Sequence, residues 1–447
     1  LSAKLKAITT MKLKTFLIVG CLGGFFALNS CTAPTNEKDY SVFVNPFIGT
    51  GGHGHTFPGA VVPHGMIQPS PDTRIDGWDA CSGYYYEDST INGFSHTHVS
   101  GTGCCDYGDV LLMPTVGEQR YQTTDPQSQQ LAYSSAFSHE NETAEPGYYS
   151  VFLDTYQVKA EISATKRSAI HRYTFPESSE AGFILDLDYS LQRQTNSDMG
   201  IEVISDTEIC GHKKTTYWAF DQYINFYAKF SKPFSYTLVT DSITMDNGKR
   251  LPVCKVLLHF NTTKDEQVLV KVGVSAVDIA GARKNVESEM PGWDFDKVRK
   301  NARSAWNQYL SKIDITTPDK DDKTIFYTAL YHTAISPNLF TDADGRYLGM
   351  DLEVHQGDTI NPLYTVFSLW DTFRALHPLM TIIDPDLNNQ FINSLIKKHQ
   401  EGGIYPMWDL GSNYTGTMIG YHAVPVIVDA YMKGYRNFDA KEAYKAS

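Results

Sequence analysis

The spacing of the hydrophobic residues changes along this chain, and that change constrains the fold more than any other feature. Before about residue 279, short runs rich in β-branched and aromatic residues alternate with turn residues. After about residue 294, apolar residues recur at the three- and four-residue spacing of helices. We therefore predict an α+β multidomain chain with its sheet first and its helices second.

The early runs have the length and spacing of an antiparallel sandwich. The clearest pair covers residues 148–153 and 156–162, with Asp154 and Thr155 as the turn between them. Further runs cover residues 171–175, 182–187, 218–230, 235–239, 253–260 and 267–274. No helical repeat separates these runs, so we predict a large antiparallel β-sandwich.

The later part has helical periodicity. A helix is predicted over residues 294–310, after the break at Pro291 and Gly292. More helices are expected at residues 323–336, 366–383, 385–399 and 417–433, with another beginning at Asp439. Helices of this length, joined by loops with proline or glycine, suggest an (α/α)6 barrel. The chain supplies too few helices for six hairpins, so we expect the barrel to be incomplete.

Five segments follow from these patterns. Residues 1–31 are upstream residues plus a lipoprotein signal peptide, and residues 32–39 are a polar tether. Residues 40–290 form the β-sandwich domain, residues 291–315 a linker helix, and residues 316–447 the incomplete (α/α)6 domain.

The N-terminal segment has the order of an export signal. Lys12 and Lys14 precede an apolar run at residues 16–28 that is too short to span a bilayer comfortably. The run ends in Leu-Asn-Ser-Cys, which resembles a bacterial lipobox with Cys31 as the lipidated residue. We expect the protein to be lipid-anchored in the cell envelope, in the periplasm or at the outer-membrane surface. Ordinary signal cleavage nearby is the alternative, and residues 1–10 are expected to lie upstream of the true start.

Charge and cysteine usage exclude some classes of protein. The formal net charge is −13, which argues against a nucleic-acid partner because phosphates require basic patches. Apart from Cys21 and Cys31, five cysteines remain: Cys81, Cys104, Cys105, Cys210 and Cys254. This odd, widely spread set does not indicate a disulfide framework. Without a CxxC pair it also does not indicate a structural zinc site.

The polar and glycine-rich segment at residues 45–109 is the first candidate site. His53 and His55, like His96 and His98, have a spacing of two, which on a strand points both imidazoles the same way. These histidines are either metal ligands, structural hydrogen-bonding groups, or groups that line a polyol site.

Two further motifs combine charge with indole rings. Residues 74–79 bring together Arg74, Asp76, Gly77 and Trp78, a mixture that suits sugar hydroxyls and the apolar face of a sugar ring. A salt-bridged turn is the alternative. In residues 368–374, Asp371 lies near a helix start, one turn before Arg374. We expect these two residues to face a cleft between the domains, although an ion-paired helix start is the alternative.

Longer motifs resemble glycoside hydrolase family 92 from about residue 40 to the end of the chain. The matching stretches are residues 45–60, GFSHTH at 93–98, GTG at 101–103, DYGD at 106–109, Ala164-Thr165, HRYTFP at 171–176, GARKN at 281–285, SLWDTFR at 368–374, MIG at 418–420 and VPVIVDAY at 424–431.

The resemblance implies an exo-acting, inverting, calcium-dependent α-mannosidase that releases mannose from mannan or N-glycans, with α-1,2 linkages expected. It implies a β-sandwich packed on an (α/α)6 barrel, with the site between them. On the matching motifs we expect these residues to bind substrate: Phe57, Arg74, Asp76, Gly77, Trp78, His98, Cys104, Trp370, Asp371, Arg374 and Trp408.

This sequence departs from the family in one respect. The family's acid and base lie in stretches resembling TLEYAYDD and GNxDxGxMS, and neither occurs here. We expect the catalytic residues, and most calcium ligands, to lie downstream of residue 447, and the chain alone to be inactive. The alternatives are a non-catalytic, lipid-anchored mannose-binding protein and an unrelated metal-dependent enzyme that uses the paired histidines.

Overall fold

The computed structural model describes residues 38–122, 127–240, 242–244 and 250–447. The predicted signal peptide and the lipidation site Cys31 lie outside these residues. Contacts divide the chain into residues 1–38 and residues 39–447, and only the second unit is described below.

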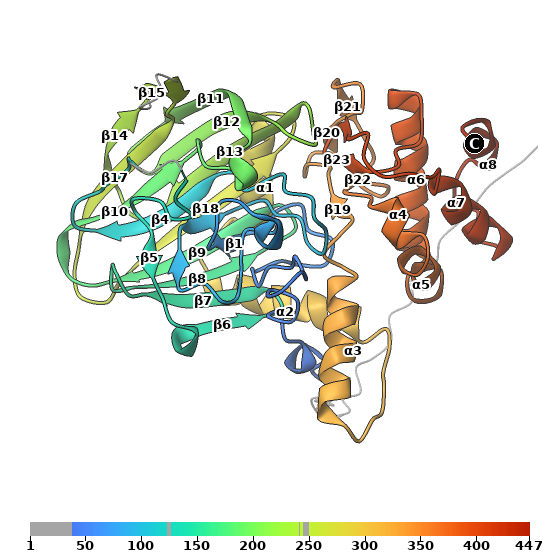
Figure 1. The fold of residues 1–447 in the computed structure, drawn as a ribbon, viewed down its shortest axis with the longest axis horizontal. Helices are drawn as coiled ribbons and strands as arrows, with labels where there is room; N and C mark the ends of the chain where they lie inside the picture. The colour runs from blue at the N-terminus through green and yellow to red at the C-terminus, as the bar shows by residue number, and fades with distance from the viewer. Residues whose placement is uncertain (1–37, 123–126, 241, 245–249) are drawn as a thin grey trace, which may run out of the picture. The chain divides into compact units, whose positions relative to one another are not determined.

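Two antiparallel sheets form the first half of this unit (Figure 1). The smaller sheet has the order β1 (Ser70–Asp72), β3 (Gly93–Ser95), β4 (Leu111–Val116), β10 (Ser178–Asp186), β17 (Lys255–Thr262) and β14 (Ser235–Val239). The larger sheet has the order β11 (Thr195–Val203), β12 (Glu208–Thr216), β13 (Gln222–Phe230), β18 (Glu266–Ser275), β9 (Ser168–Phe175), β8 (Val158–Ala164), β7 (Tyr148–Leu153) and β6 (Glu142–Glu145). We call residues 70–275 the sandwich half.

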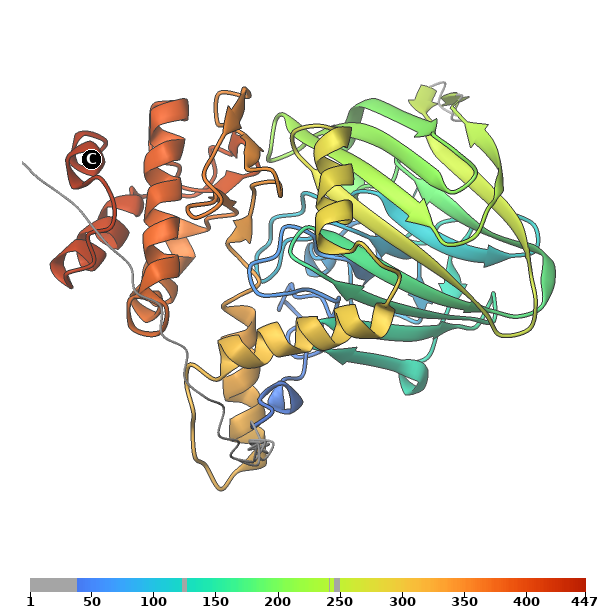
Figure 2. The ribbon, with the colours of Figure 1, turned by 180° about the vertical axis from the view of Figure 1, so that it is seen from behind.

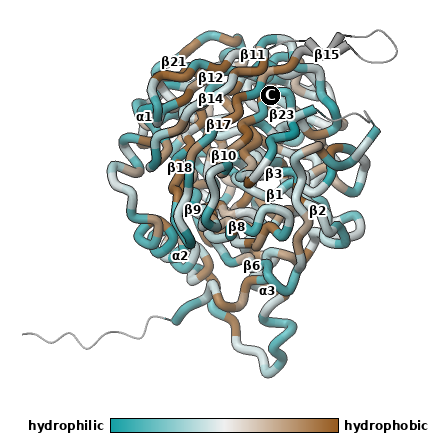
Figure 3. Tube along the Cα trace, turned by 90° about the vertical axis from the view of Figure 1, so that its left-hand side faces the viewer, coloured by the Kyte–Doolittle hydropathy of each residue, from teal (hydrophilic) through white to brown (hydrophobic). Residues whose placement is uncertain are grey.

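Apolar side chains from both sheets meet in one core. Phe183 of β10 lies at its centre and contacts the rings of Phe175, Phe230 and Phe260 at centroid distances of 5.5 to 5.6 Å. Hydrophobic residues follow the strands in Figure 3. The predicted order of an antiparallel sandwich followed by helices is confirmed.

Helices dominate residues 279–447, which we call the helical half. They are α1 (Ile279–Glu289), α2 (Phe295–Leu310), α3 (Lys320–His332), α4 (Leu369–Thr372), α5 (Leu376–Ile383), α6 (Pro385–Gly402), α7 (Ala423–Met432) and α8 (Ala440–Lys445). Aspartates cap several of them: the carboxylates of Asp294, Asp319 and Asp384 each accept a backbone N–H of the first turn. No helix among the described residues is long and apolar enough to cross a membrane.

Three expectations about helices need correction. Helix α1 was not predicted; it is capped by Asp278 and packs on β13 and β18 (Figure 2). The helix expected at residues 366–383 is two helices, because Ala375 between them has a non-helical backbone. The helix expected from residue 417 begins only at Ala423, since Met418 and Gly420 have positive φ angles.

Short strand pairs complete the fold. They are β2 (Thr90–Ile91) with β5 (Ser135–Ala136), β15 (Ser242–Thr244) with β16 (Arg250–Pro252), β19 (Asn338–Leu339) with β22 (Tyr364–Thr365), β20 (Arg346–Leu348) with β21 (Val354–Gln356), and β23 (Asp409–Leu410) with β24 (Asn413–Tyr414). The last three lie among the helices and are too short to show a period in the sequence.

Hydrogen bonds join the two halves. Asn413 accepts from the backbone N–H of Asp221 at 2.9 Å and donates to its carbonyl oxygen at 3.0 Å, so one side-chain amide pairs as a neighbouring strand would. Asp342 accepts from the Ser275 hydroxyl at 2.6 Å and from the Asn285 amide at 2.8 Å. These contacts tie the ends of β18 and α1 to the loop between β19 and β20.

Candidate functional site

Three of the predicted substrate-binding residues line one open cavity. It has a volume of about 510 Å³, within the range of ligand pockets. Polar side chains and one glycine line it: Thr73, Arg74, Asp76, Gly77, Glu87, Asp88, Ser89, Thr90, Gln129 and Gln130. Such a lining suits a hydroxylated ligand better than an apolar one.

The charged groups of this cavity are paired. The Nε of Arg74 donates to both carboxylate oxygens of Asp88, at 3.0 and 2.8 Å. Asp76 accepts from Gln129 and, at 2.5 Å, from Arg193. Burial opposes ionisation of Asp76, but these two hydrogen bonds hold its pKa below the usual range. Hydrogen bonds therefore hold the Arg74 and Asp76 side chains in place, as they would in a salt-bridged turn.

Trp78 follows directly and presents an exposed indole. It begins a short 3-10 helix, Trp78–Ala80, after Gly77, whose φ of 110° disfavours other residues. The indole is 60% exposed, and the His55 ring meets it edge-on at 4.7 Å. It lies so close to Gly103 that a β-carbon there would lie 2.1 Å from the ring. An exposed, well-supported indole can cover the apolar face of a sugar.

The paired histidines do not converge. His53 bonds the Asp79 carboxylate, whereas His55 packs on Trp78. His96 contacts the Val110 carbonyl oxygen and His171, whereas His98 contacts the Gln68 carbonyl oxygen and Asp72. Among the described residues, no three His, Cys, Asp or Glu side chains group as metal ligands.

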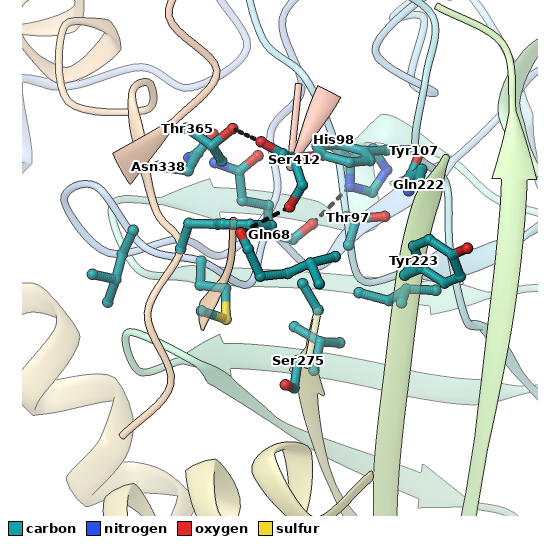
Figure 4. A pocket seen from close by; sticks show the side chains of 18 of the residues that line it. Gln68, Thr97, His98, Tyr107, Gln222, Tyr223, Ser275, Asn338, Thr365 and Ser412 are labelled. Atoms are coloured by element: carbon teal, nitrogen blue, oxygen red, sulfur yellow. Dashed lines mark hydrogen bonds between the residues drawn. The ribbon is translucent and has the colours of Figure 1, made fainter. Parts of the chain in front are cut away.

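His98 lies at a small cavity where the two halves meet (Figure 4). Thr97, His98 and Gln222 face Asn338, Thr365 and Ser412 across it. Its volume is about 40 Å³, and a water needs about 10 to 15 Å³ by this measure. The cavity therefore holds a few waters at most, and a mannose ring does not fit.

Trp408 and Cys104 share a buried cluster. The cluster also contains Val99, Ala219, Val366 and Leu410. The Trp408 indole donates from Nε1 to the Ser368 hydroxyl at 2.7 Å, and that hydroxyl donates to Asp371 at 2.5 Å. A buried indole in the core of the site is thereby linked to an exposed carboxylate at the start of α4.

The residue that follows Trp408 takes part in a buried ion pair. Lys398 of α6 contacts Asp409 at 2.9 Å, and both side chains are essentially inaccessible to solvent. Asp409 also accepts from the Thr365 hydroxyl and the backbone N–H of Phe367, at 2.8 and 3.1 Å. These bonds fix Trp408 and the segment before α4.

Asp371 and Arg374 are both exposed and have different hydrogen-bond partners. Arg374 donates to the Trp370 carbonyl oxygen, and its guanidinium lies 4.9 Å from the centre of the Trp370 ring. By contrast, four predicted residues have at most 2% of their surface exposed: Phe57, His98, Cys104 and Trp408. Direct contact of these four with a sugar stays a prediction.

Contacts connect the two groups of predicted residues. Trp78 packs on Gly103, the next residue Cys104 shares the buried cluster with Trp408, and Trp408 is bonded through Ser368 to Asp371. One continuous line thus runs from the exposed indole of the sandwich half to the exposed carboxylate of the helical half.

Comparison of the sequence with family profiles identifies both halves. The glycosyl hydrolase family 92 N-terminal domain matches residues 43–275, and the family 92 catalytic domain matches residues 281–447. The chain belongs to glycoside hydrolase family 92.

Solved structures of family 92 members have the same fold. A family 92 α-mannosidase from Bacteroides thetaiotaomicron, also solved in complex with mannoimidazole, is 36% identical with a TM-score of 0.86, over 92% of this chain and 56% of its own. An inverting family 92 mannosidase from the same organism is 28% identical with a TM-score of 0.80, over 91% of this chain and 55% of its own.

A relative from the fungus Arthroderma benhamiae is described as an uncharacterized secreted glycosidase. It is 28% identical over 372 residues, which is 74% of this chain and 47% of the relative. The family 92 chain thus spans about half the length of the relatives it matches.

Sequence reasoning missed several residues of the candidate site. Gln129 and Arg193 hold Asp76 but lie far from it in sequence, so no local pattern marks them. Ser368 was visible only as the first residue of the SLWDTFR motif. The ring of Trp218 lies 5.9 Å from that of Trp408. Trp218 is the first residue of the strand-like run 218–230, so the sequence predicted it as part of a strand.

Proposed function

We propose that this chain forms the substrate-facing part of an exo-acting α-mannosidase that releases mannose from mannan or N-glycans. Family membership and the mannosidase relatives support this proposal. The observation that carries it is the line of contacts from Trp78 to Asp371, because it connects candidate residues of both halves.

The residues present are suited to binding. The exposed Trp78 indole offers an apolar surface to a sugar ring, while the neighbouring cavity offers Arg74 and Asp76 to hydroxyl groups. Inversion, which we propose from the named relative, needs two carboxyls about 6.5 to 9.5 Å apart, one as acid and one as base. We assign neither role to a residue of this chain, since the stretches that carry them in the family are absent from its sequence.

Calcium dependence is proposed from the family resemblance alone. A calcium ion takes six to eight oxygen ligands. The described residues do not bring three or more His, Cys, Asp or Glu side chains together as metal ligands. We therefore expect most of the calcium ligands on other residues.

We also propose that Cys31 anchors the protein in the cell envelope. The basic, apolar and lipobox order of residues 11–31 supports this, and the related secreted glycosidase is consistent with export. Cys31→Ala should release the protein from membranes and abolish acyl labelling. Retention of the acyl label by Cys31→Ala would refute the anchor.

Binding and turnover test the main proposal separately. Titrate the 447-residue chain with α-1,2- and α-1,3-linked mannobiose, and assay release of mannose with and without calcium. A full-length family 92 α-mannosidase serves as the positive control. We expect binding with a preference for the α-1,2 linkage and no turnover. Turnover like the control would show that the acid and base lie within this chain, and absence of binding would overturn the proposal.

Trp78→Ala locates the site. Loss of the stacking surface should weaken mannobiose binding up to about tenfold, or about 1.4 kcal/mol. Phe220→Ala is the matched control, because Phe220 is similarly exposed, at 58%, but is not among the residues that line the cavity. Equal losses in both variants would remove Trp78 from the site.

A further inference from the structure

Two cysteine thiols lie close to the short 3-10 helix Trp78–Ala80. Cys81 and Cys105 are free in the structure, and both donate to the Gly103 carbonyl oxygen, at 3.5 and 3.2 Å. Both sulfur atoms therefore lie against the same carbonyl oxygen. The two cysteines are 24 positions apart in sequence, so the fold and not the chain connectivity brings them together.

The neighbouring Cys104 points elsewhere. Its thiol donates to the Asp106 carboxylate at 3.4 Å, and its side chain belongs to the buried cluster of Trp408. Burial raises the pKa of the Cys104 thiol, and the Asp106 charge adds to this effect. Of the three cysteines in this region, only Cys81 and Cys105 share an acceptor.

We propose that Cys81 and Cys105 are a redox-active dithiol that a disulfide-bearing oxidant converts into an intramolecular disulfide. The proposal does not depend on the mannosidase function, because it rests on the geometry of the thiols alone.

The reaction is an ordinary thiol–disulfide exchange. Cys105 is 6% exposed, whereas Cys81 is 0% exposed. The Cys105 sulfur therefore attacks the oxidant disulfide, and one half of the oxidant leaves as a thiol. Cys81 then attacks the Cys105 sulfur of this mixed disulfide and releases the second thiol. Two protein thiols lose two electrons and two protons, and the oxidant gains them as two thiols.

Oxidation would change the support of the exposed indole. In the reduced form the Cys81 thiol donates to the Trp78 carbonyl oxygen at 2.9 Å. A disulfide removes that donor, and it covalently joins the Trp78 turn to the segment of Gly103, on which the indole rests. The dithiol is therefore placed to alter how firmly Trp78 is held.

Peptide mapping tests the proposal on the full chain. Treat the folded protein with oxidised glutathione, block free thiols by alkylation, and digest it with trypsin. No Lys or Arg lies between Arg74 and Arg120, so all three cysteines fall in one peptide. Cleavage after Glu87 then separates Cys81 from Cys104 and Cys105, and a disulfide is expected to hold the halves together until a reductant is added.

Serine variants identify the partner. The link should survive Cys104→Ser and disappear in Cys81→Ser and Cys105→Ser, each checked for native circular dichroism. The proposal is overturned if the wild-type halves separate without reductant, which includes the case of a bond between Cys104 and Cys105. It is also overturned if Cys105→Ser remains linked. Should a serine variant not fold, the wild-type map alone still decides whether Cys81 is cross-linked.

Discussion

The sandwich half and the helical half bury their apolar residues differently. In the sandwich half each sheet covers the other, and the central Phe183 has no exposed surface. Among the described residues, every large apolar side chain that is more than 70% exposed lies in the helical half: Ile360, Ile382, Ile419, Met432 and Tyr444. The sheets therefore need no further surface to close their core, whereas the helices present apolar faces of the kind that partner surfaces cover.

Removing the central ring of the sandwich should have the largest effect. Phe183→Ala leaves a cavity among Phe175, Phe230 and Phe260 and should lower the free energy of unfolding by about 3 to 5 kcal/mol. Urea unfolding measures this, with the exposed Phe220→Ala as control, expected within about 0.5 kcal/mol. A loss below about 1 kcal/mol would break the comparison, since it would mean that the sheets do not depend on this core.

Asp342 tests the contact between the halves through pH. Burial raises the pKa of Asp342 to about 6, although hydrogen bonds from Ser275 and Asn285 oppose the shift. A raised pKa means that the stabilising contribution is present below the unfolded-state pKa and is lost as pH rises through about 6. Asp342→Asn cannot ionise and can keep both hydrogen bonds. Its unfolding free energy should therefore gain roughly 2 to 3 kcal/mol relative to wild type between pH 4 and 7.

Unfolding of both proteins across this pH range gives the difference directly. The exposed Asp371→Asn controls for the loss of one carboxylate. A difference between Asp342→Asn and wild type that does not change with pH would show that Asp342 titrates normally.

A smaller effect is expected where the buried indole meets α4. Ser368→Ala removes the acceptor of the Trp408 N–H, and an unpaired buried donor costs about 1 to 3 kcal/mol. Ser368→Thr keeps the hydroxyl and should recover most of the loss. Thermal unfolding measures both variants. Equal stability of the alanine variant and wild type would indicate that a water replaces the hydroxyl.

The smallest change in stability is expected on the apolar helical face. Ile382→Ser combined with Met432→Ser alters side chains that are 75% and 76% exposed, so unfolding should shift within about 0.5 kcal/mol. Self-association, measured by sedimentation, should decrease, because apolar patches drive it. A strongly destabilised double variant would mean that this face already packs within the chain.

The sequence predicted the parts of the fold whose patterns are long and local. Helices α2 and α6 show a helical period with an aspartate cap, and β7, β8 and β18 are β-rich runs bounded by turn residues. Helix α1 escaped prediction although Ile279, Ala282 and Val286 have helical spacing; these residues pack with Cys210 and Tyr227 of the larger sheet. The break at Ala375 is a non-helical backbone conformation that no local sequence pattern predicted.

For the candidate site, too, the sequence predicted some features and missed others. Arg74, Asp76 and Gly77 are neighbours in sequence, and they do share a cavity. The ion-paired helix start, the alternative for Asp371 and Arg374, is not seen: Asp371 accepts from the Ser368 hydroxyl, and Arg374 donates to the Trp370 carbonyl oxygen. Spacing along a helix shows which residues can meet, but not which partner each one takes.

The hydrogen bond to the Asn413 side-chain amide allows the opening of the contact between the halves to be measured. The backbone N–H of Asp221 donates to this side chain. Its exchange with deuterium requires that the bond opens, so the exchange rate of that single proton reports how often the helical half lifts away from the edge of β13. Slow exchange would describe a molecule that works as one rigid block. Rapid exchange at Asp221, with slow exchange in β9 and β18, would describe two blocks joined by a hinge.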